Sequence, residues 1–224
     1  FYPVAGTKDV LLLENRRGGI RRFVQSLEQP SARGVIASAV VNCNPFTNGH
    51  LYLIQRAAGE CALLHVFVLS EDRSTFSAQA RLQLVRENTA HLPNVVVHPT
   101  ADYLISSATF PDYFLKDKAR ASQVNCELDL TIFARHFAQP MGITRRYVGS
   151  EPDCATTAAY NRQMKELLPP MGIEVVEIPR HEIAGQAVSA SRVRALLQEG
   201  RLEDIRPLVP PATFAYLERM TLHG

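Results

Sequence analysis

Residues 35–50 constrain the fold of this chain more than any other stretch. Val35–Val41 is a continuous apolar run, as expected for a strand that is buried on both faces of a parallel sheet. A short polar turn, Asn44–His50, follows it, and Leu51–Ala58 has the spacing of an amphipathic helix. The stretch therefore predicts a buried strand, a tight turn and a helix, which is the repeating unit of an α/β fold.

The same turn has the chemistry of an anion site. Thr47 or Asn48 can cap the helix with a side-chain oxygen, and Gly49 lets the backbone approach a ligand closely. The helix N-terminus offers free N–H groups and a partial positive charge, which suit a phosphate. His50, in the first turn, can donate a hydrogen bond to a phosphate oxygen. The simpler interpretation is a capped helix with an incidental histidine.

A second segment of this kind, Val188–Arg194, lies near the other end of the chain. Ser189 and Ser191 stand at the expected start of a helix, where hydroxyl and N–H groups can hold phosphate oxygens. Arg194 lies a turn or less further on and can reach the same phosphates with its planar fork; the alternative is a solvated helix arginine. Arg192 points elsewhere on the helix and is expected to be structural. We expect the two segments to face each other across one crevice.

Between these segments, strands and helices alternate regularly. The expected strands are 35–41, 63–69, 95–98, 146–149 and 174–178, and the expected helices are 51–59, 78–92, 116–138, 156–168, 189–199, 201–206 and 213–219. This order predicts a Rossmann-like parallel sheet with helices on both faces. Ligands bind beyond the C-terminal ends of such strands, so the turn at 44–50, the loop at 71–74, His98 and residues 149–151 are expected to gather around one crevice.

Three further candidates lie at strand ends. Arg73 can reach a phosphate, and Gly149 and Glu151 can line a nucleotide pocket, although a solvated loop and an ordinary turn explain them as well. Arg145 and Arg146 form a small basic spot, which is usually a solvated face.

Composition excludes several classes of protein. At 224 residues, of which 46% are hydrophobic, the chain can form one α/β domain of ordinary size. A formal net charge of +2 gives no argument for a nucleic-acid partner. No apolar run approaches the length of a membrane span, so no membrane partner is expected. The scattered cysteines predict unpaired thiols in a cytoplasmic protein, with neither disulfides nor a metal site: Cys43, Cys61, Cys126 and Cys154.

The sequences of the two motifs resemble the signatures of a known superfamily. T-x-G-H at 47–50 and V-S-x-x-x-x-R at 188–194 are similar to the H/T-x-G-H and I-S-x-x-x-x-R/K signatures of the nucleotidylyltransferases. Thr47 stands where many relatives have His, so only the hydroxyl of Thr47 is available for a role in the site. The resemblance implies a fold of the HUP type, catalytic roles for His50, Arg194 and Thr47, and nucleotide contacts from Asn42, Cys43, Asn44, Gly49, Arg73, Gly149, Glu151, Ser189 and Ser191.

Longer stretches resemble one family within that superfamily, citrate lyase ligase. They are residues 42–50, 68–74, 108–117 and 148–152, and the resemblance extends over about residues 35–210. Family members also carry an N-terminal acetyltransferase-like domain. Residues 1–34, which include a turn-rich stretch and a likely linker, are therefore expected to be a connector or the remnant of such a domain, and residues 35–224 the nucleotidyltransferase-like ligase domain.

This resemblance implies an ATP-dependent acid–thiol ligase. Acetate attacks the α-phosphate of ATP to give acetyl-adenylate and pyrophosphate, and the prosthetic-group thiol of the acyl carrier subunit of citrate lyase then takes the acetyl group as AMP leaves. Mg²⁺ on the phosphates is expected, but no local acidic cluster identifies protein ligands for it. Two alternatives remain: an adenylyltransferase of the phosphopantetheine type and a nucleotide-binding module without turnover.

Overall fold

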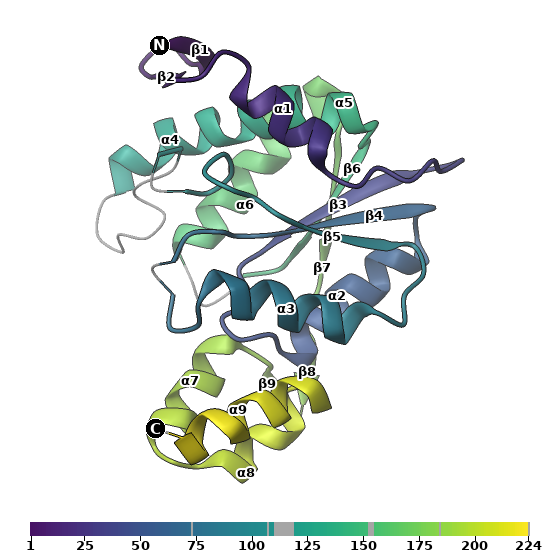
Figure 1. Cartoon of the computed structure of the whole chain (residues 1–224), viewed down its shortest axis with the longest axis vertical. Coiled ribbons are helices and arrows are strands. Elements are labelled where there is room, and N and C mark those ends of the chain that lie inside the picture. The colour runs from purple at the N-terminus through teal and green to yellow at the C-terminus, as the bar shows by residue number, and fades with distance from the viewer. Residues whose placement is uncertain (73, 107, 110–118, 152–154, 184, 224) are drawn as a thin grey trace.

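A five-stranded sheet forms the centre of the molecule (Figure 1). The computed structural model describes residues 1–224 except 73, 107, 110–118, 152–154, 184 and 224, and only the backbone of 119–124 and 223. The strand order is β5-β4-β3-β6-β7, and every neighbouring pair is parallel. The strands are β3 (Ile36–Val41), β4 (Leu63–Val68), β5 (Val95–Pro99), β6 (Arg145–Gly149) and β7 (Glu174–Ile178). The predicted Rossmann-like fold is confirmed.

Alternating side chains of the strands build two separate cores, because successive residues of a strand point to opposite faces. Ala37, Ala39 and Val41 pack with α2 (Asn48–Gly59) and α3 (Ala78–Thr89) on one face. Ile36 and Val40 pack on the other face. That face is covered by α1 (Gly19–Ser26), α4 (Ala119–Ile132), a π-helical segment (Phe133–Ala138) and α6 (Ala155–Leu167). A short α5 (Gln139–Met141) leads into β6.

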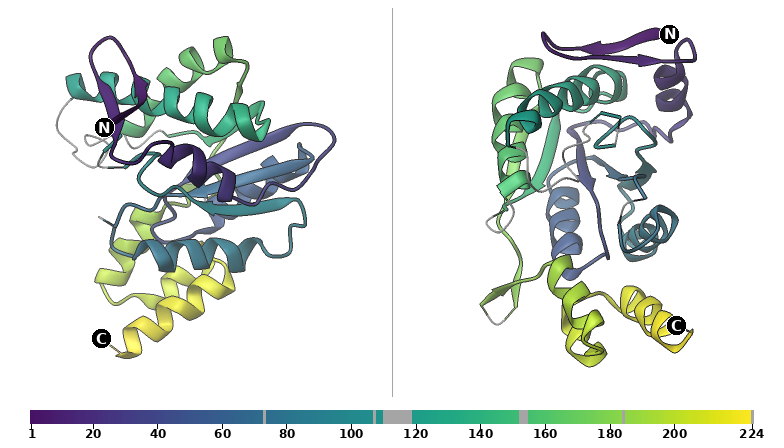
Figure 2. Two further views of the ribbon diagram at one scale, coloured as in Figure 1. Left: turned by 45° about the horizontal axis from the view of Figure 1, so that its top comes forward. Right: turned by 90° about the vertical axis from the view of Figure 1, so that its left-hand side faces the viewer.

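An N-terminal hairpin lies outside the central sheet. It consists of β1 (Tyr2–Gly6) and β2 (Leu11–Glu14), which pair antiparallel. Ala5 joins the core under α4, and the Nε2 of His136 donates to the carbonyl of Val4 at 2.9 Å. The hairpin therefore packs on the α/β unit, at the end opposite to the C-terminus (Figure 2).

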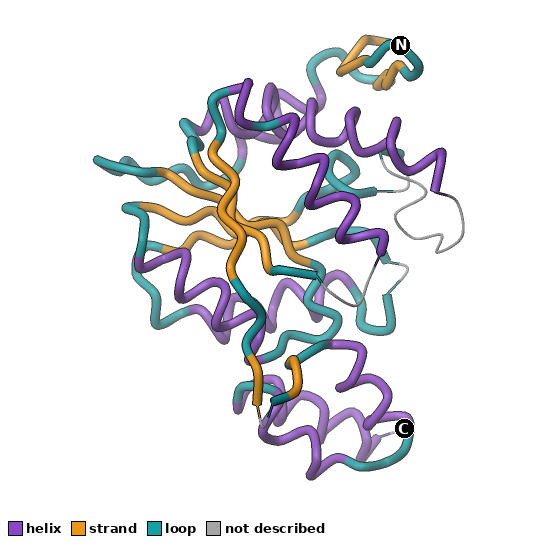
Figure 3. Tube along the Cα trace, turned by 180° about the vertical axis from the view of Figure 1, so that it is seen from behind, coloured by secondary structure: helices purple, strands orange, loops and turns teal. Residues whose placement is uncertain are grey.

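The C-terminal helices form a small lobe with a core of its own. They are α7 (Ala190–Gln198), α8 (Leu202–Ile205) and α9 (Pro211–His223), reached through a two-stranded ribbon of β8 (Glu182–Ile183) and β9 (Gln186–Ala187). The last helix is longer than predicted. Phe76 and Val188 pack among the buried side chains of this lobe. The lobe lies next to the sheet (Figure 3). None of the described helices is long and apolar enough to cross a bilayer.

The buried Arg81 ties the ends of two central strands together. Its guanidinium donates to the backbone carbonyls of Asn42, Leu69, Glu71 and Phe76 at 3.2, 2.7, 2.6 and 3.0 Å, and also to the Asn42 side chain at 2.7 Å. Four carbonyls in two loops thus have the same donor. A side chain of α3 therefore fixes the C-terminal edge of the sheet at β3 and β4.

We expect Arg81→Met to destabilise the fold by roughly 3 kcal/mol or more, because it leaves several buried carbonyls without a donor. Urea unfolding followed by circular dichroism measures this. Arg86→Met, in the same helix, is the matched control, since the exposed Arg86 makes one long hydrogen bond of 3.4 Å to Val97. Equal unfolding free energies for the two variants would contradict the role of Arg81.

Candidate functional site

A pocket of about 750 Å³ opens at the C-terminal edge of the sheet. Its walls come from the ends of β3, β6 and β7 and from the N-terminal turns of α2, α6 and α7. This edge is where open parallel sheets bind ligands, and the volume is typical of a small-molecule site.

The first motif forms a reciprocal cap at the start of α2. The Oγ1 of Thr47 accepts from the His50 amide at 3.4 Å, and the Thr47 amide donates to the Nδ1 of His50 at 3.0 Å. Because an N–H group must meet a lone pair, Nδ1 is unprotonated and the neutral ring carries its proton on Nε2. The cap therefore fixes both the orientation and the tautomer of His50, and leaves Nε2–H as its free donor.

His50 is also held in its neutral form. Burial, and then the positive charge of Arg180, lower the pKa of His50 to about 4. At neutral pH the ring is thus uncharged and presents a single donor. It lines the pocket, where such a donor suits a phosphate oxygen without holding it as an ion pair.

The two motifs meet at Gly49. A Cβ at this position would lie 2.9 Å from the carbonyl oxygen of Val188, closer than real Cβ contacts come. Arg194 bridges the same junction, since Nη1 donates to the carbonyl of Asn44 at 2.5 Å and Nη2 to the Oγ of Ser191 at 3.1 Å. His50 and Arg194 line one pocket, so the prediction that the two segments share a crevice is confirmed.

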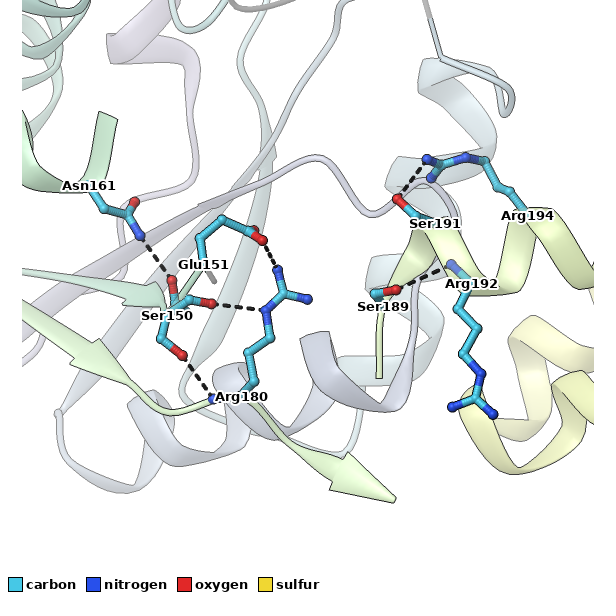
Figure 4. Close-up of polar contacts among 9 residues, drawn as sticks. Ser150, Glu151, Asn161, Arg180, Ser189, Ser191, Arg192 and Arg194 are labelled. Atoms are coloured by element: carbon cyan, nitrogen blue, oxygen red, sulfur yellow. Dashed lines mark hydrogen bonds and ion pairs between the residues drawn. The ribbon is translucent and has the colours of Figure 1, made fainter. Parts of the chain in front are cut away.

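The start of α7 is capped by Ser189, whose Oγ accepts from the Arg192 amide at 3.2 Å. The Arg192 side chain points away from Ser191 and Arg194, as predicted (Figure 4). Ser189, Ser191 and Arg194 line the pocket.

The turn after β3 lines the pocket with residues whose side chains are already engaged. The Asn42 side chain accepts from Arg81, and the Asn44 side chain accepts from the Phe76 amide at 3.0 Å. Cys43 is buried at a left-handed φ of 53°, and burial raises the pKa of its thiol. These residues therefore have mainly backbone atoms to offer a ligand.

The turn after β6 is clamped by an arginine that was not predicted from the sequence. Arg180 forms an ion pair with Glu151, its Nε donates to the Ser150 carbonyl at 2.9 Å, and its amide donates to the Ser150 Oγ at 3.1 Å (Figure 4). Asn161 also donates to the Gly149 carbonyl at 3.0 Å. The signal was present, because Arg180 follows the predicted strand 174–178 at the edge where ligands bind.

Gly149 faces open space in the pocket. A Cβ there would meet no atom of the described residues within 4 Å, unlike one at Gly49. The space beside Gly149 is thus available to a ligand.

The predictions for His98 and Arg146 were wrong. His98 does not join the crevice, because its side chain packs against Phe67 on the opposite sheet face from α2 and its Nε2 lies 2.9 Å from the Nδ1 of the buried His65. Arg146 is not part of a solvated face, because only 2% of it is exposed. Arg145 alone reaches the surface, where it pairs with Glu174 at 2.7 Å.

The loop at 71–74 does not line the pocket as predicted, because none of residues 71, 72 and 74 contributes to its walls. Arg73 itself lies outside the described residues. Cys43 and Cys61 are free thiols, as predicted, whereas Cys154 lies outside the described residues.

Comparison with known proteins identifies the family. The citrate lyase ligase C-terminal domain family matches residues 36–217. The chain belongs to this family. It is 43% identical to the [citrate [pro-3S]-lyase] ligase of Escherichia coli (strain K12), over 96% of this chain and 63% of that protein. It is 41% identical to the ligase of the same name from Klebsiella pneumoniae, over 98% of this chain and 66% of that protein. The chain thus spans about two thirds of the length of these relatives.

Solved structures share the fold at low sequence identity. Thermotoga maritima TmcAL in its apo form superposes with a TM-score of 0.55 at 17% identity, over 85% of this chain and 57% of that chain. A bifunctional NMN adenylyltransferase/ADP ribose pyrophosphatase from Francisella tularensis superposes with a TM-score of 0.51 at 16% identity, over 84% and 49% of the two chains. These similarities support the nucleotidyltransferase-like fold.

We expect Gly49→Ala to separate the two motifs, because the new Cβ would force the start of α2 away from the Val188 carbonyl. Overpacking of this kind typically costs about 1–3 kcal/mol, and binding of an ATP analogue should weaken as well. Urea unfolding and calorimetric titration measure the two effects.

Gly59→Ala is the matched control within the same helix, since a Cβ there meets nothing within 4 Å. It should leave stability unchanged or raise it by up to about 1 kcal/mol. If Gly49→Ala behaves like this control, the close contact between the motifs is not needed.

Proposed function

We propose that this chain carries the adenylate-forming site of an ATP-dependent acid–thiol ligase, which acetylates the prosthetic-group thiol of the acyl carrier subunit of citrate lyase. A carboxylate oxygen of acetate bonds to the α-phosphorus of ATP, and pyrophosphate leaves. The thiol sulfur then bonds to the acetyl carbonyl carbon, its proton is lost, and AMP leaves. The observation that carries the proposal is the pocket in which two capped helix N-termini, His50 and Arg194 converge.

The comparisons support the same reaction class. The relatives that match over nearly the whole chain are named as ligases of citrate lyase. Structures of the same fold hold related ligands: Thermotoga maritima TmcAL is bound with α-thio ATP and the Francisella tularensis enzyme is complexed with AMP. We propose that this chain has the ligase activity of its relatives, that it binds ATP and AMP as the structural neighbours do, and that it acts in the cytoplasm.

The phosphates would lie between the starts of α2 and α7. The first N–H groups of a helix have no partner within the helix, so the amides of Asn48 and Gly49 can point at a phosphate. His50 adds its Nε2–H and Arg194 the N–H groups that Asn44 and Ser191 do not use. Negative charge grows on the α-phosphate and on pyrophosphate during adenylation, and donors already fixed in place meet it without reorganisation.

Each remaining residue has a role that follows from its position. Thr47 orients His50 through the cap, and Ser189 caps the helix that carries Arg194. Asn42, Cys43 and Asn44 supply the backbone of the phosphate-side wall. Gly149 and Glu151 would line the nucleoside side, where the open space at Gly149 accommodates a ligand. Arg73 is proposed as a further phosphate contact.

Mg²⁺ is expected to accompany ATP, but the described residues offer no ready site for it. No group of three or more His, Cys, Asp or Glu side chains gathers among them, and the Glu151 carboxylate is paired with Arg180. We therefore place the metal on the phosphates of the nucleotide. No step of the proposal depends on a protein ligand to the metal.

A pyrophosphate-release assay with ATP tests the proposal. Release that depends on acetate supports the ligase, release that depends on phosphopantetheine supports the adenylyltransferase, and ATP binding without either supports a module without turnover. The second and third outcomes would overturn the proposal.

We expect His50→Ala to slow acetate-dependent pyrophosphate release by roughly 100- to 1,000-fold, the usual cost of one lost donor to transition-state charge. The Oγ1 of Thr47 can still accept from the amide of residue 50, so the fold should survive, as circular dichroism would verify. Preformed acetyl-adenylate should restore much of the thiol transfer.

His91→Ala is the matched control, because His91 is exposed and its ring contacts the Gln55 side chain at 3.3 Å. Its rate should equal that of the parent. A parent-like rate for His50→Ala, or an equally deep defect with acetyl-adenylate supplied, would place His50 outside the adenylation step.

A further inference from the structure

The buried Arg146 has hydrogen-bonding capacity that the described residues do not use. Its Nε and Nη1 have no hydrogen-bond partner among them, although only 2% of the residue is exposed. Its guanidinium lies 4.3 Å from the centre of the Phe133 ring, which supports one of its faces. Unpaired donors of a buried charge are costly, so such a group points to a ligand.

One side of the guanidinium is balanced by a fixed network. Its Nη2 donates to the Tyr160 hydroxyl at 3.4 Å, and this hydroxyl donates to the buried Asp129 carboxylate at 2.7 Å. The other Asp129 oxygen accepts from the amide of Ile105 at 2.6 Å and from the hydroxyl of Thr109 at 3.2 Å. Asp129 thus accepts three hydrogen bonds, and it holds Tyr160 and Arg146 in position without meeting Nε or Nη1.

Arg146 lines the same pocket as His50 and Arg194, on the opposite sheet face from α2. Five other pocket residues belong to the core cluster on this sheet face, and we call this part of the pocket the recess: Val40, Ile105, Val148, Tyr160 and Met164. Most of these side chains are apolar. The recess therefore combines a single unsatisfied cation with a hydrocarbon wall.

We infer that this recess is the subsite for the acid substrate, in which Arg146 binds the carboxylate and the apolar wall receives the methyl group. The inference rests on the proposed ligase function and names the acid-binding residue for it. A carboxylate accepts two parallel N–H bonds from one edge of a guanidinium, which here pairs Nε or Nη1 with the second N–H of Nη2, and acetate is small. An oxygen of the bound carboxylate then faces the pocket that holds the α-phosphate.

The other substrates fit this recess less well. The thiol arm of the carrier ends in a group without charge, so it does not require a buried cation. The phosphates of ATP are negatively charged, but in the proposed function they are already bound by His50, Arg194 and the two helix N-termini.

The test compares Arg146→Gln and Arg146→Lys with the matched control Arg145→Met, in acetate-dependent pyrophosphate release. Loss of a bidentate charged contact should raise the KM for acetate roughly 10- to 100-fold in Arg146→Gln. The KM for ATP should change by less than about twofold, and Arg146→Lys should fall between Gln and the parent. Arg145→Met loses a neighbouring arginine on the surface and should keep the parent KM for acetate.

A second variant leaves the charge network intact, in case Arg146→Gln fails to fold. Val148→Phe narrows the recess beside Arg146 and should also raise the KM for acetate while ATP binding is retained. A direct measurement, independent of turnover, is the ¹⁵N–¹H signal of Arg146 Nε during an acetate titration. It should shift in the parent and stay fixed in Val148→Phe.

The outcomes separate this inference from the function on which it rests. If the parent releases pyrophosphate with acetate but Arg146→Gln and Val148→Phe keep the parent KM, the inference fails and the ligase function stands. If acetate shifts the Arg146 signal but gives no pyrophosphate, the ligase function fails and the carboxylate subsite stands. An unshifted Arg146 signal at saturating acetate overturns the subsite.

Discussion

The buried guanidinium of Arg81 is the interaction on which the candidate site most depends. Parallel strands end in loops whose carbonyls have no neighbouring strand to satisfy them, and a ligand pocket prevents those loops from being covered by other elements. Arg81 satisfies these carbonyls with hydrogen bonds to the loops that follow β3 and β4. The turn that leads to Thr47 and His50 is thereby fixed by a side chain that does not line the pocket, so its pocket-facing atoms stay available to a ligand.

The second constraint is the approach of two segments that are far apart in sequence. Gly49 permits the start of α2 to touch the backbone before α7, and Arg194 reaches back to the carbonyl of Asn44. The two signature motifs thus contact each other directly. The reciprocal cap between Thr47 and His50 has a chemical consequence as well, because its hydrogen bond decides which nitrogen of the ring can donate.

Sequence patterns predicted the sheet, because buried parallel strands are apolar runs of the length seen at Ile36–Val41 and Leu63–Val68. They also predicted that His50 and Arg194 share a pocket, since both segments are helix N-termini with groups that suit a phosphate. They failed where the answer depends on which face a side chain takes. Arg145 and Arg146 are adjacent and chemically identical, yet one lies at the surface and the other in the core. Arg180 was missed because its role depends on a turn formed by residues some 30 positions away.

The central claim is that the two motifs form a single phosphate site. A crystal structure of this chain with α,β-methylene ATP, which cannot release pyrophosphate, tests it most directly. The account predicts the triphosphate between the starts of α2 and α7, with phosphate oxygens at roughly 3 Å from the Nε2 of His50 and from the Arg194 guanidinium. A triphosphate bound elsewhere, for example along the surface at Arg145, with the Nε2 of His50 facing solvent, would contradict it.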